Sequence, residues 1–161
     1  MLRIPVESRA KRAASAWVEV DLGAVAHNVS VWRSILPKSS RLLAVVKSNG
    51  YGHGMLRVAR TALAAGAEEL VVASVQEGAA LRSSGITSPI LIAGPICPDE
   101  ASVVVQNGLV ARIGSMELAA ALGRATRRYL PVHIEVDSGM TRYGVAPDEL
   151  GQFVEALEAR G

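Results

Sequence analysis

Short apolar runs alternate with helix-length segments along the chain. Runs of about four to eight residues that are rich in branched side chains and bounded by turn signals are typical of buried strands. The last of these runs also alternates sharply between apolar and polar positions, as a strand does. The pattern predicts strands at Arg41–Lys47, Leu70–Ser74, Pro89–Ala93, Gly108–Ile113 and Pro131–Asp137.

The segments between these runs carry the start and stop signals of helices. Asp21 has the position of an N-cap for a helix that runs through Leu36, and Ser74 and Glu77 have the spacing of a capping box. An extended segment is expected at Trp17–Asp21. Further helices are predicted at Met55–Ala65, from Ser74 to about Gly85, from Pro98, from Ser115 to about Leu122, and from Pro147 to the chain end.

This alternation predicts an α/β fold with a parallel sheet and right-handed crossovers. An open doubly wound sheet and a (β/α)8 barrel both fit the pattern. No G-x-G-x-x-G follows any of the runs and no P-loop is present, so nothing favours a dinucleotide-binding fold. In both architectures the functional side chains lie at the carboxyl ends of the strands, so polar residues at those positions are the candidates.

Composition narrows the class of protein. The chain has 161 residues, of which 50% are hydrophobic and 4% aromatic, enough apolar material for the core of one domain and too much for wholesale disorder. A single cysteine, Cys97, excludes an intrachain disulfide and is assigned a structural role. No histidine–carboxylate set has metal-ligand spacing and no apolar stretch is long enough to span a membrane, so we expect neither a metal nor a membrane partner.

The positive charge is concentrated at the N-terminus. Residues 1–16 contain four basic residues and one acidic residue, so their net charge of +3 leaves −1 for the rest of a chain whose total is +2. A nearly neutral body gives no reason to expect nucleic acid as a partner. We therefore predict a flexible basic tail at residues 1–16 and a folded part at residues 17–161.

Lys47 ends the first predicted strand and is one of three lysines in the chain. Contact with an apolar strand partly desolvates such an amine and makes it a better nucleophile toward aldehydes, although an isolated lysine at a strand end more often extends into solvent. Gly50, Gly52 and Gly54 follow and allow tight turns whose N–H groups can hold phosphate, and Tyr51 adds a hydroxyl. An amine beside phosphate donors points to pyridoxal 5'-phosphate as cofactor.

The segment Ala44–Gly54, AVVKSNGYGHG, resembles the cofactor-lysine signature of the alanine racemase family. Trp17–Asn28 resembles an upstream segment of the same family. Ser48 and Gly50 depart from the signature, because alanine is usual at both positions.

The resemblance implies roles for Lys47 and Tyr51, and two further residues of the segment are expected to support the site. Lys47 would hold pyridoxal 5'-phosphate covalently and act as the base on one face of the substrate. Tyr51 would contact the cofactor phosphate. Asn49 and His53 would support the site, His53 by a further hydrogen bond or by orienting the loop.

A second polar segment ends the fifth predicted strand. Alternation places His133, Glu135 and Asp137 on one face, and Arg142 follows in a glycine-flanked loop. These residues alone also fit a structural ion-pair network. The segment His133–Gly144 resembles the second signature of alanine racemases, in which the arginine binds the substrate carboxylate.

One departure from the second signature involves charge. Many members of the family carry a lysine, which can be carbamylated, where Glu135 stands. A glutamate supplies a permanent negative charge at the same place. We therefore hypothesise that Glu135 orients Arg142 toward the substrate without any modification, with His133 in a supporting role.

The resemblance covers residues 16–161 and implies an incomplete (β/α)8 TIM barrel with about five βα units. We therefore expect residues 17–161 to be a partial N-terminal barrel domain, with the remainder of the barrel and a C-terminal β domain absent. Unpaired strand edges would then make the chain marginally folded by itself. The implied enzyme interconverts L-alanine and D-alanine in the cytoplasm for peptidoglycan synthesis. A homodimer is expected at full length, because the family's opposite base is a tyrosine of the partner subunit.

Two alternatives remain open. One is another pyridoxal-phosphate enzyme of this fold type, a broad-specificity amino-acid racemase or a decarboxylase, although the continuation Tyr51–Gly54 favours alanine racemase over decarboxylases. The other is a truncated chain that binds the cofactor without catalysis. Residues assigned to packing or loop support rather than to the site are His27, Trp17, Trp32 and Met140.

Overall fold

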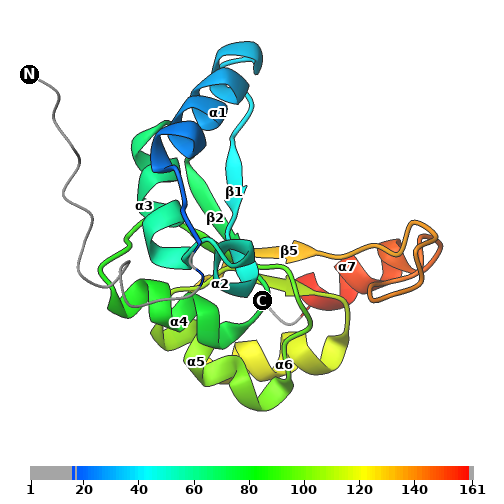
Figure 1. Cartoon of the computed structure of the whole chain (residues 1–161). Coiled ribbons are helices and arrows are strands. Elements are labelled where there is room, and N and C mark those ends of the chain that lie inside the picture. The colour runs from blue at the N-terminus through cyan, green and yellow to red at the C-terminus, as the bar shows by residue number, and fades with distance from the viewer. Residues whose placement is uncertain (1–15, 17, 160–161) are drawn as a thin grey trace, which may run out of the picture.

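The computed structural model describes Ala16 and residues 18–159, which form strands and helices in regular alternation (Figure 1). The predicted tail therefore lies outside the described residues, apart from Ala16. The strands are β1 (Leu43–Val45), β2 (Glu69–Val72), β3 (Ile90–Ile92), β4 (Ala111–Ile113) and β5 (Val132–Ile134). The helices are α1 (Leu22–Ile35), α2 (Lys47–Tyr51), α3 (Met55–Ala64), α4 (Val75–Ser83), the 3-10 turn η1 (Pro98–Glu100), α5 (Ala101–Gln106), α6 (Met116–Ala125) and α7 (Leu150–Glu158).

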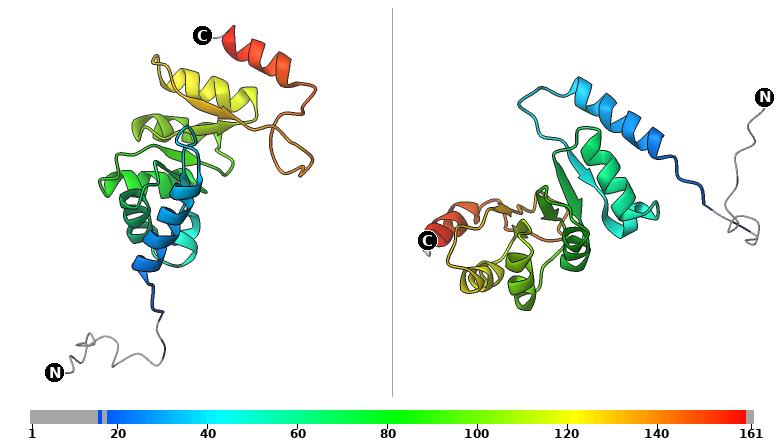
Figure 2. Two further views of the ribbon diagram at one scale, coloured as in Figure 1. Left: turned by 90° about the horizontal axis from the view of Figure 1, so that it is seen from above. Right: turned by 90° about the vertical axis from the view of Figure 1, so that its left-hand side faces the viewer.

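Parallel pairing joins the strands in chain order. β1 pairs with β2 and β2 with β3, and β4 pairs with β5. An isolated parallel bridge between Leu91 and Val110 connects β3 to the start of β4. The helices follow one another around the outside of the curved sheet (Figure 2). A doubly wound sheet would carry helices on both faces and reverse its strand order, so the structure is part of a (β/α)8 barrel, and this prediction is confirmed.

The outer face of the sheet and the helices form one apolar core. Leu70 of β2, Ile90 and Ile92 of β3, and Ile113 of β4 are almost completely buried. Burial of each such side chain contributes about 1.5–3 kcal/mol to folding. Val45 of β1 points to the other face and is 47% exposed. In register with Val45, the inner face also carries Val71 and Leu91, whereas the central residues of β4 and β5 on that face are polar.

Three predicted helix starts carry side-chain caps. Asp21, Ser74 and Ser115 each accept a hydrogen bond from an N–H group in the first turn of α1, α4 and α6, respectively. The predicted capping box is only half formed. The Glu77 N–H donates to Ser74 Oγ at 3.3 Å, but the Glu77 carboxylate accepts from the Ala73 N–H at 2.8 Å.

Some local predictions are wrong. The strands are shorter than predicted, because the backbone leaves the extended conformation at Lys47 and pairing in β5 ends at Ile134. Trp32 is 58% exposed and does not anchor the core, since α1 packs beside α3 without burying any of its own residues. Trp17 lies outside the described residues, and Cys97 is exposed.

Within the described part of the chain, no helix has the length and apolar character that a membrane crossing requires.

Arg82, in the last turn of α4, ties together two loops at the amino end of the sheet. Its Nη1 donates to the carbonyls of Ile86 and Ser88 at 2.6 and 3.1 Å. Its Nε and Nη2 donate to the carbonyls of Asn107 and Gly108 at 2.8 and 3.0 Å. Burial lowers the pKa of Arg82 from its ordinary value, yet a guanidinium stays charged at neutral pH. One side chain thus holds the turns before β3 and β4.

We predict that Arg82→Lys lowers the free energy of unfolding by about 2–3 kcal/mol, because the carbonyls lose charged donors that a single ammonium cannot replace across two loops. Urea denaturation measures this change. Arg57→Lys, on the exposed side of α3, is the matched control and should leave the midpoint unchanged. Equal midpoints for the Arg82 variant and the unmodified protein would contradict the role of Arg82.

Candidate active site

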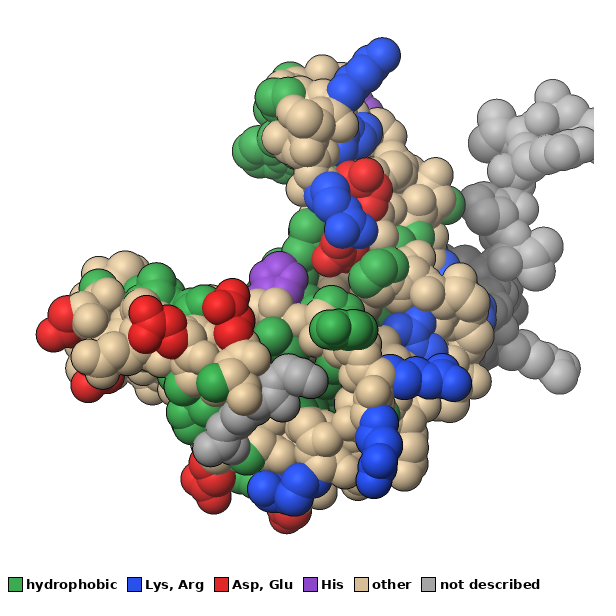
Figure 3. All heavy atoms as spheres, turned by 180° about the vertical axis from the view of Figure 1, so that it is seen from behind, with side chains coloured by type: hydrophobic (Ala, Val, Ile, Leu, Met, Phe, Trp, Pro, Cys, Tyr) green, Lys and Arg blue, Asp and Glu red, His purple; other side chains and the backbone are tan. Residues whose placement is uncertain are grey.

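The carboxyl ends of the strands lie along one edge of the sheet, and the predicted site residues follow them. Lys47 comes two residues after β1, and Glu135 directly follows β5. Arg112 of β4 stands opposite His133 of β5 in register, so both side chains lie on the inner face, together with Glu135 two residues further along. Figure 3 shows a hollow between the part that carries α1 and the part that carries α7, with acidic side chains gathered over the latter.

The segment after Lys47 is a turn of left-handed helix. The φ angles of Ser48, Asn49, Gly50 and Tyr51 are 53°, 55°, 63° and 53°. A left-handed conformation costs roughly 1–2 kcal/mol for each residue with a Cβ, so the surrounding structure must stabilise it. α2 is therefore a strained turn directly beside the candidate nucleophile, where the sequence predicted tight turns at the glycines but not the left-handed conformation of Ser48, Asn49 and Tyr51.

Hydrogen bonds inside the segment stabilise this turn. The N–H groups of Gly50, Gly52 and Gly54 donate to carbonyl oxygens of residues 46, 48 and 49 at 2.8, 3.1 and 2.8 Å. The sequence predicted that N–H groups in this turn are free to hold a phosphate. For these three glycines the prediction is wrong, because the left-handed turn uses their N–H groups to close itself.

Asn49 and His53 hold the two ends of the turn. Asn49 Oδ1 accepts a hydrogen bond from the Met55 N–H at 2.9 Å, which joins the turn to the start of α3. His53 Nδ1 lies 3.0 Å from the Gly50 carbonyl and 3.1 Å from the Tyr51 carbonyl. His53 was expected either to give a further hydrogen bond to the site or to orient the loop, and these contacts within the segment fit the second role.

Lys47 and Tyr51 are brought together by the turn. Lys47 is half-buried, and its Nζ lies 6.0 Å from the centroid of the Tyr51 ring, at the limit of a cation–π contact. Tyr51 is 59% exposed, which leaves its surface available to a ligand. The arrangement places an amine and a phenol on one side of a rigid turn.

Arg112 links the ends of three strands. Its Nη1 lies 2.9 Å from Glu135 Oε2, and its Nη2 donates to the carbonyl of Ala93, directly after β3. The Arg112 and Glu135 side chains are only 24% and 29% exposed, so their charges compensate each other in a partly desolvated place. Arg112 is not among the residues predicted for the site, although a charged residue in the apolar run Gly108–Ile113 was a signal.

The contacts of the two side chains contradict the hypothesis that Glu135 orients Arg142. Glu135 pairs with Arg112, its neighbour on the inner face, while Arg142 is exposed and its Nη2 donates to Met140 Sδ at 3.0 Å. The physical reason is distance, because Arg112 lies on the strand next to β5, whereas Arg142 lies in the loop that leaves the sheet after β5. Gly144 ends this loop with φ 130°, so close to the Glu135 backbone that a Cβ there would lie 2.9 Å from it.

Asp137 organises the loop after β5. Its Oδ1 accepts hydrogen bonds from the N–H groups of Thr141 and Gly139 at 2.8 and 3.0 Å. These two bonds, that of Thr141 foremost, lower the pKa of Asp137 from its ordinary value. At the end of the loop the Tyr143 hydroxyl accepts from the Gly114 N–H at 2.9 Å, which fastens the loop to the end of β4.

The two polar segments stay apart. Within the described residues, no hydrogen bond or ion pair joins Lys47 to Arg142, and Figure 1 shows α2 well separated from the loop between β5 and α7. The described part of the chain also holds no group of three His, Cys, Asp or Glu side chains that could bind a metal ion. The two segments and β4 offer an amine (Lys47), a phenol (Tyr51) and two guanidinium groups (Arg112 and Arg142).

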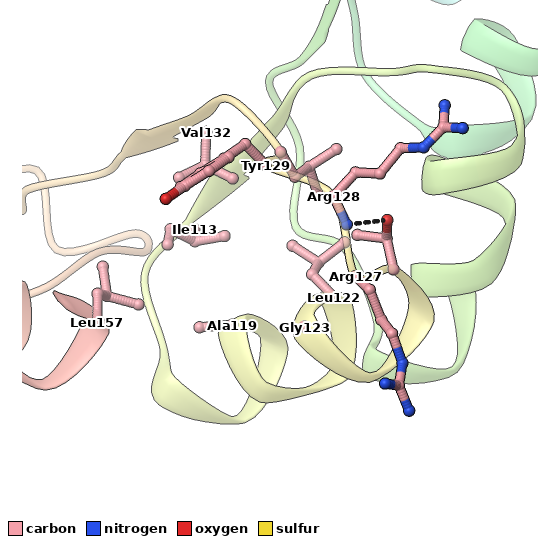
Figure 4. A pocket seen from close by; sticks show the side chains of 11 residues that line it. Ile113, Ala119, Leu122, Gly123, Arg127, Arg128, Tyr129, Val132 and Leu157 are labelled. Carbon is pink, nitrogen blue, oxygen red and sulfur yellow. Dashed lines mark hydrogen bonds between the residues drawn. The ribbon is translucent and has the colours of Figure 1, made fainter. Parts of the chain in front are cut away.

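A cavity of about 540 Å³ lies elsewhere, on the outer face of β5. Ile113, Leu122, Val132 and Leu157 supply its apolar walls, and Tyr129 stands at its rim (Figure 4). Since Ile113 belongs to the outer face, the cavity is separated by the sheet from Arg112 and His133. It has no part in the candidate site.

Comparison with known sequences gives one consistent family. A family model described as the N-terminal domain of alanine racemase matches residues 20–161. An alanine racemase of Symbiobacterium thermophilum is 48% identical over 144 residues, which are 88% of this chain and 38% of that protein. The chain therefore spans less than half the length of the curated relatives that it matches.

Solved structures agree with the sequence comparison. The alanine racemase from E. faecalis superposes with a TM-score of 0.81 at 35% identity, over 87% of this chain and 39% of that one. The alanine racemase from Bacillus anthracis, solved with bound L-Ala-P, superposes with a TM-score of 0.80 at 38% identity, over 88% of this chain and 38% of that one.

We predict that acid releases the loop after β5. The pKa of Asp137 is depressed in the folded state, so its contribution to loop stability is full above the unfolded pKa of about 3.9 and is lost as the pH falls through the lower folded value. An NMR titration that follows the Thr141 amide below pH about 4 measures the release.

Two variants make this test specific. Asp137→Asn should abolish the titration of the Thr141 amide, because the uncharged side chain keeps an acceptor oxygen but has no proton to bind. Asp148→Asn removes an exposed acid nearby and should leave the titration in place. A Thr141 amide that does not respond to acid in the unmodified protein would refute the role of Asp137.

Proposed function

Since the chain belongs to the alanine racemase N-terminal domain family, we propose that it is the lysine-bearing part of an alanine racemase. This enzyme is an isomerase that interconverts L-alanine and D-alanine with pyridoxal 5'-phosphate as cofactor. The observation that carries the proposal is Lys47 at the end of β1, held beside Tyr51 by a left-handed turn. The range matched by the family model includes this turn and the loop with Arg142.

The residues around Lys47 fit pyridoxal 5'-phosphate. The half-buried Lys47 amine is the group that binds an aldehyde, and the exposed Tyr51 offers a hydroxyl to a phosphate. The N–H groups of Gly50, Gly52 and Gly54 already donate to carbonyl oxygens within the segment. We therefore assign the phosphate contact of this segment to the Tyr51 hydroxyl. When bound, the cofactor delocalises the charge that develops at the substrate α-carbon.

The chain's own residues then bind and orient the substrate and move its proton. Lys47 serves as the base on one face: its neutral amine accepts the α-proton of one enantiomer, and in the reverse direction its ammonium gives a proton to that same face. The opposite face needs a second base, which the resemblance assigns to a tyrosine of the partner subunit. Arg142 binds the substrate carboxylate through its planar guanidinium. Glu135 and His133 support the site from the inner face, and Arg112 balances the charge of Glu135.

The setting of the reaction belongs to the same proposal. Residues 17–161 form part of the barrel domain, preceded by the basic tail at residues 1–16. The complete enzyme is a homodimer in the cytoplasm, and its product D-alanine supplies peptidoglycan precursors. The likeness of this chain to proteins named alanine racemase supports these statements.

We predict that Lys47→Arg abolishes covalent binding of pyridoxal 5'-phosphate, because a guanidinium does not condense with the aldehyde at neutral pH. Reduction with borohydride followed by peptide mass spectrometry measures the adduct at residue 47. Lys38→Arg, on an exposed turn, is the matched control and should retain the adduct at Lys47. An unmodified protein that carries no adduct at Lys47 would refute the proposed function.

We further predict that Arg142→Leu weakens substrate binding by about 10- to 100-fold, which corresponds to one charge-assisted hydrogen-bonding site. The KM for L-alanine in a racemisation assay measures this loss. Arg127→Leu, at the cavity on the outer face, should leave KM unchanged. Equal KM values for the Arg142 variant and the unmodified enzyme would remove Arg142 from the substrate site.

A further inference from the structure

Where β1 leaves the sheet, two backbone N–H groups lose the carbonyl acceptors that a continuing ladder would supply. The last regular rung joins the Val46 N–H to the Val71 carbonyl at 2.8 Å. In a continuing parallel ladder, the Ala73 N–H would donate to the Val46 carbonyl and the Ser48 N–H to the Ala73 carbonyl. Here the Val46 carbonyl accepts from the Gly50 N–H instead, at 2.8 Å. The N–H groups of Ala73 and Ser48 therefore need another acceptor.

One carboxylate accepts from both of these N–H groups. Glu77 Oε1 accepts from the Ser48 N–H at 2.6 Å, and Glu77 Oε2 accepts from the Ala73 N–H at 2.8 Å. Glu77 is half-buried in the first turn of α4, and its own N–H donates to the Ser74 cap. The side chain thus fills the gap where the two strands diverge and replaces the missing rungs of the ladder.

The bond to the Ser48 N–H acts directly on the candidate nucleophile. That N–H belongs to the peptide group between Lys47 and Ser48, so Glu77 sets the orientation of this peptide plane. The same plane defines the start of the left-handed turn, in which Ser48 has φ 53°. Because the Lys47 side chain leaves the backbone beside this plane, a change in its tilt redirects the Lys47 amine.

We propose that Glu77 is a positioning residue for Lys47. It acts through the backbone and touches neither cofactor nor substrate, and it holds the peptide after Lys47 so that the amine points to the cofactor aldehyde. The part of this proposal that concerns the cofactor rests on the proposed function. The part that concerns the peptide plane rests only on the two hydrogen bonds of the Glu77 carboxylate.

A purely structural role of Glu77 must be separated from this one. An acidic residue in the first turn also stabilises a helix through its dipole. Glu117 supplies the matched control, since it is an exposed acid in the first turn of α6, behind the cap Ser115. Glu117→Ala removes the helix effect in a neighbouring βα unit and leaves the Lys47 turn untouched.

The first readout needs no cofactor. In Glu77→Ala, hydrogen exchange of the Ser48 and Ala73 amides should accelerate about tenfold or more, because each loses a charged acceptor. Glu77→Gln keeps one carbonyl oxygen and should protect one of the two amides. Glu117→Ala should change neither amide. Unchanged exchange at Ser48 in both Glu77 variants would overturn the proposal.

The second readout uses pyridoxal 5'-phosphate itself as the probe. After borohydride reduction, the adduct at Lys47 should fall about tenfold in Glu77→Ala relative to the adduct at exposed Lys38, and Glu77→Gln should restore part of it. An equal loss in Glu117→Ala, or an unchanged ratio in Glu77→Ala, would overturn the proposal. An unmodified protein without any adduct at Lys47 would refute the proposed function, and hydrogen exchange at Ser48 would still decide whether Glu77 sets the peptide plane.

Discussion

Parallel pairing of the strands in chain order is the constraint on which the rest of the structure depends. It brings every strand's carboxyl end to one edge, and it divides the side chains of each strand between an outer and an inner face. The outer face is occupied by residues such as Ile90 and Ile113, which the helices bury almost completely. Charged residues therefore have a place only on the inner face and at the edge, where Arg112, Glu135 and Lys47 are found.

The strain of the left-handed turn is balanced by contacts from two directions. Within the segment, Asn49 and the glycine N–H groups close the turn and attach it to α3. From the next βα unit, Glu77 reaches the peptide between Lys47 and Ser48. Together these contacts fix the conformation of the backbone directly after Lys47. The free-energy cost of the left-handed residues is offset by these contacts, which hold the backbone after β1 in one conformation.

On the inner face, each charged side chain pairs with the group that is nearest in the fold and not with the group that its sequence motif suggests. Arg112 and Glu135 neutralise each other across adjacent strands, so neither charge is left alone in a partly desolvated place. Asp137 is held by backbone N–H groups instead of a cation, and it shapes the loop that carries Arg142. The guanidinium of Arg142 is thereby separated from the glutamate seven residues before it, and it contacts Met140 instead.

The sequence by itself determined the order of strands and helices, the caps at Asp21 and Ser115, and the position of Lys47 at a strand end. All of these depend on apolar periodicity and on residues within one turn, which are local properties. The periodicity of the chain left both the barrel and the doubly wound sheet open, and the barrel that the family resemblance implied was confirmed by the strand neighbours in the tertiary structure. Only the tertiary structure decided that Glu135 pairs with Arg112 and that Glu77 binds the turn after Lys47, since both contacts join separate βα units. The spacing of residues along the chain does not show which side chains are close enough to touch across a sheet. That distance in the folded structure determined which charged groups formed ion pairs and hydrogen bonds.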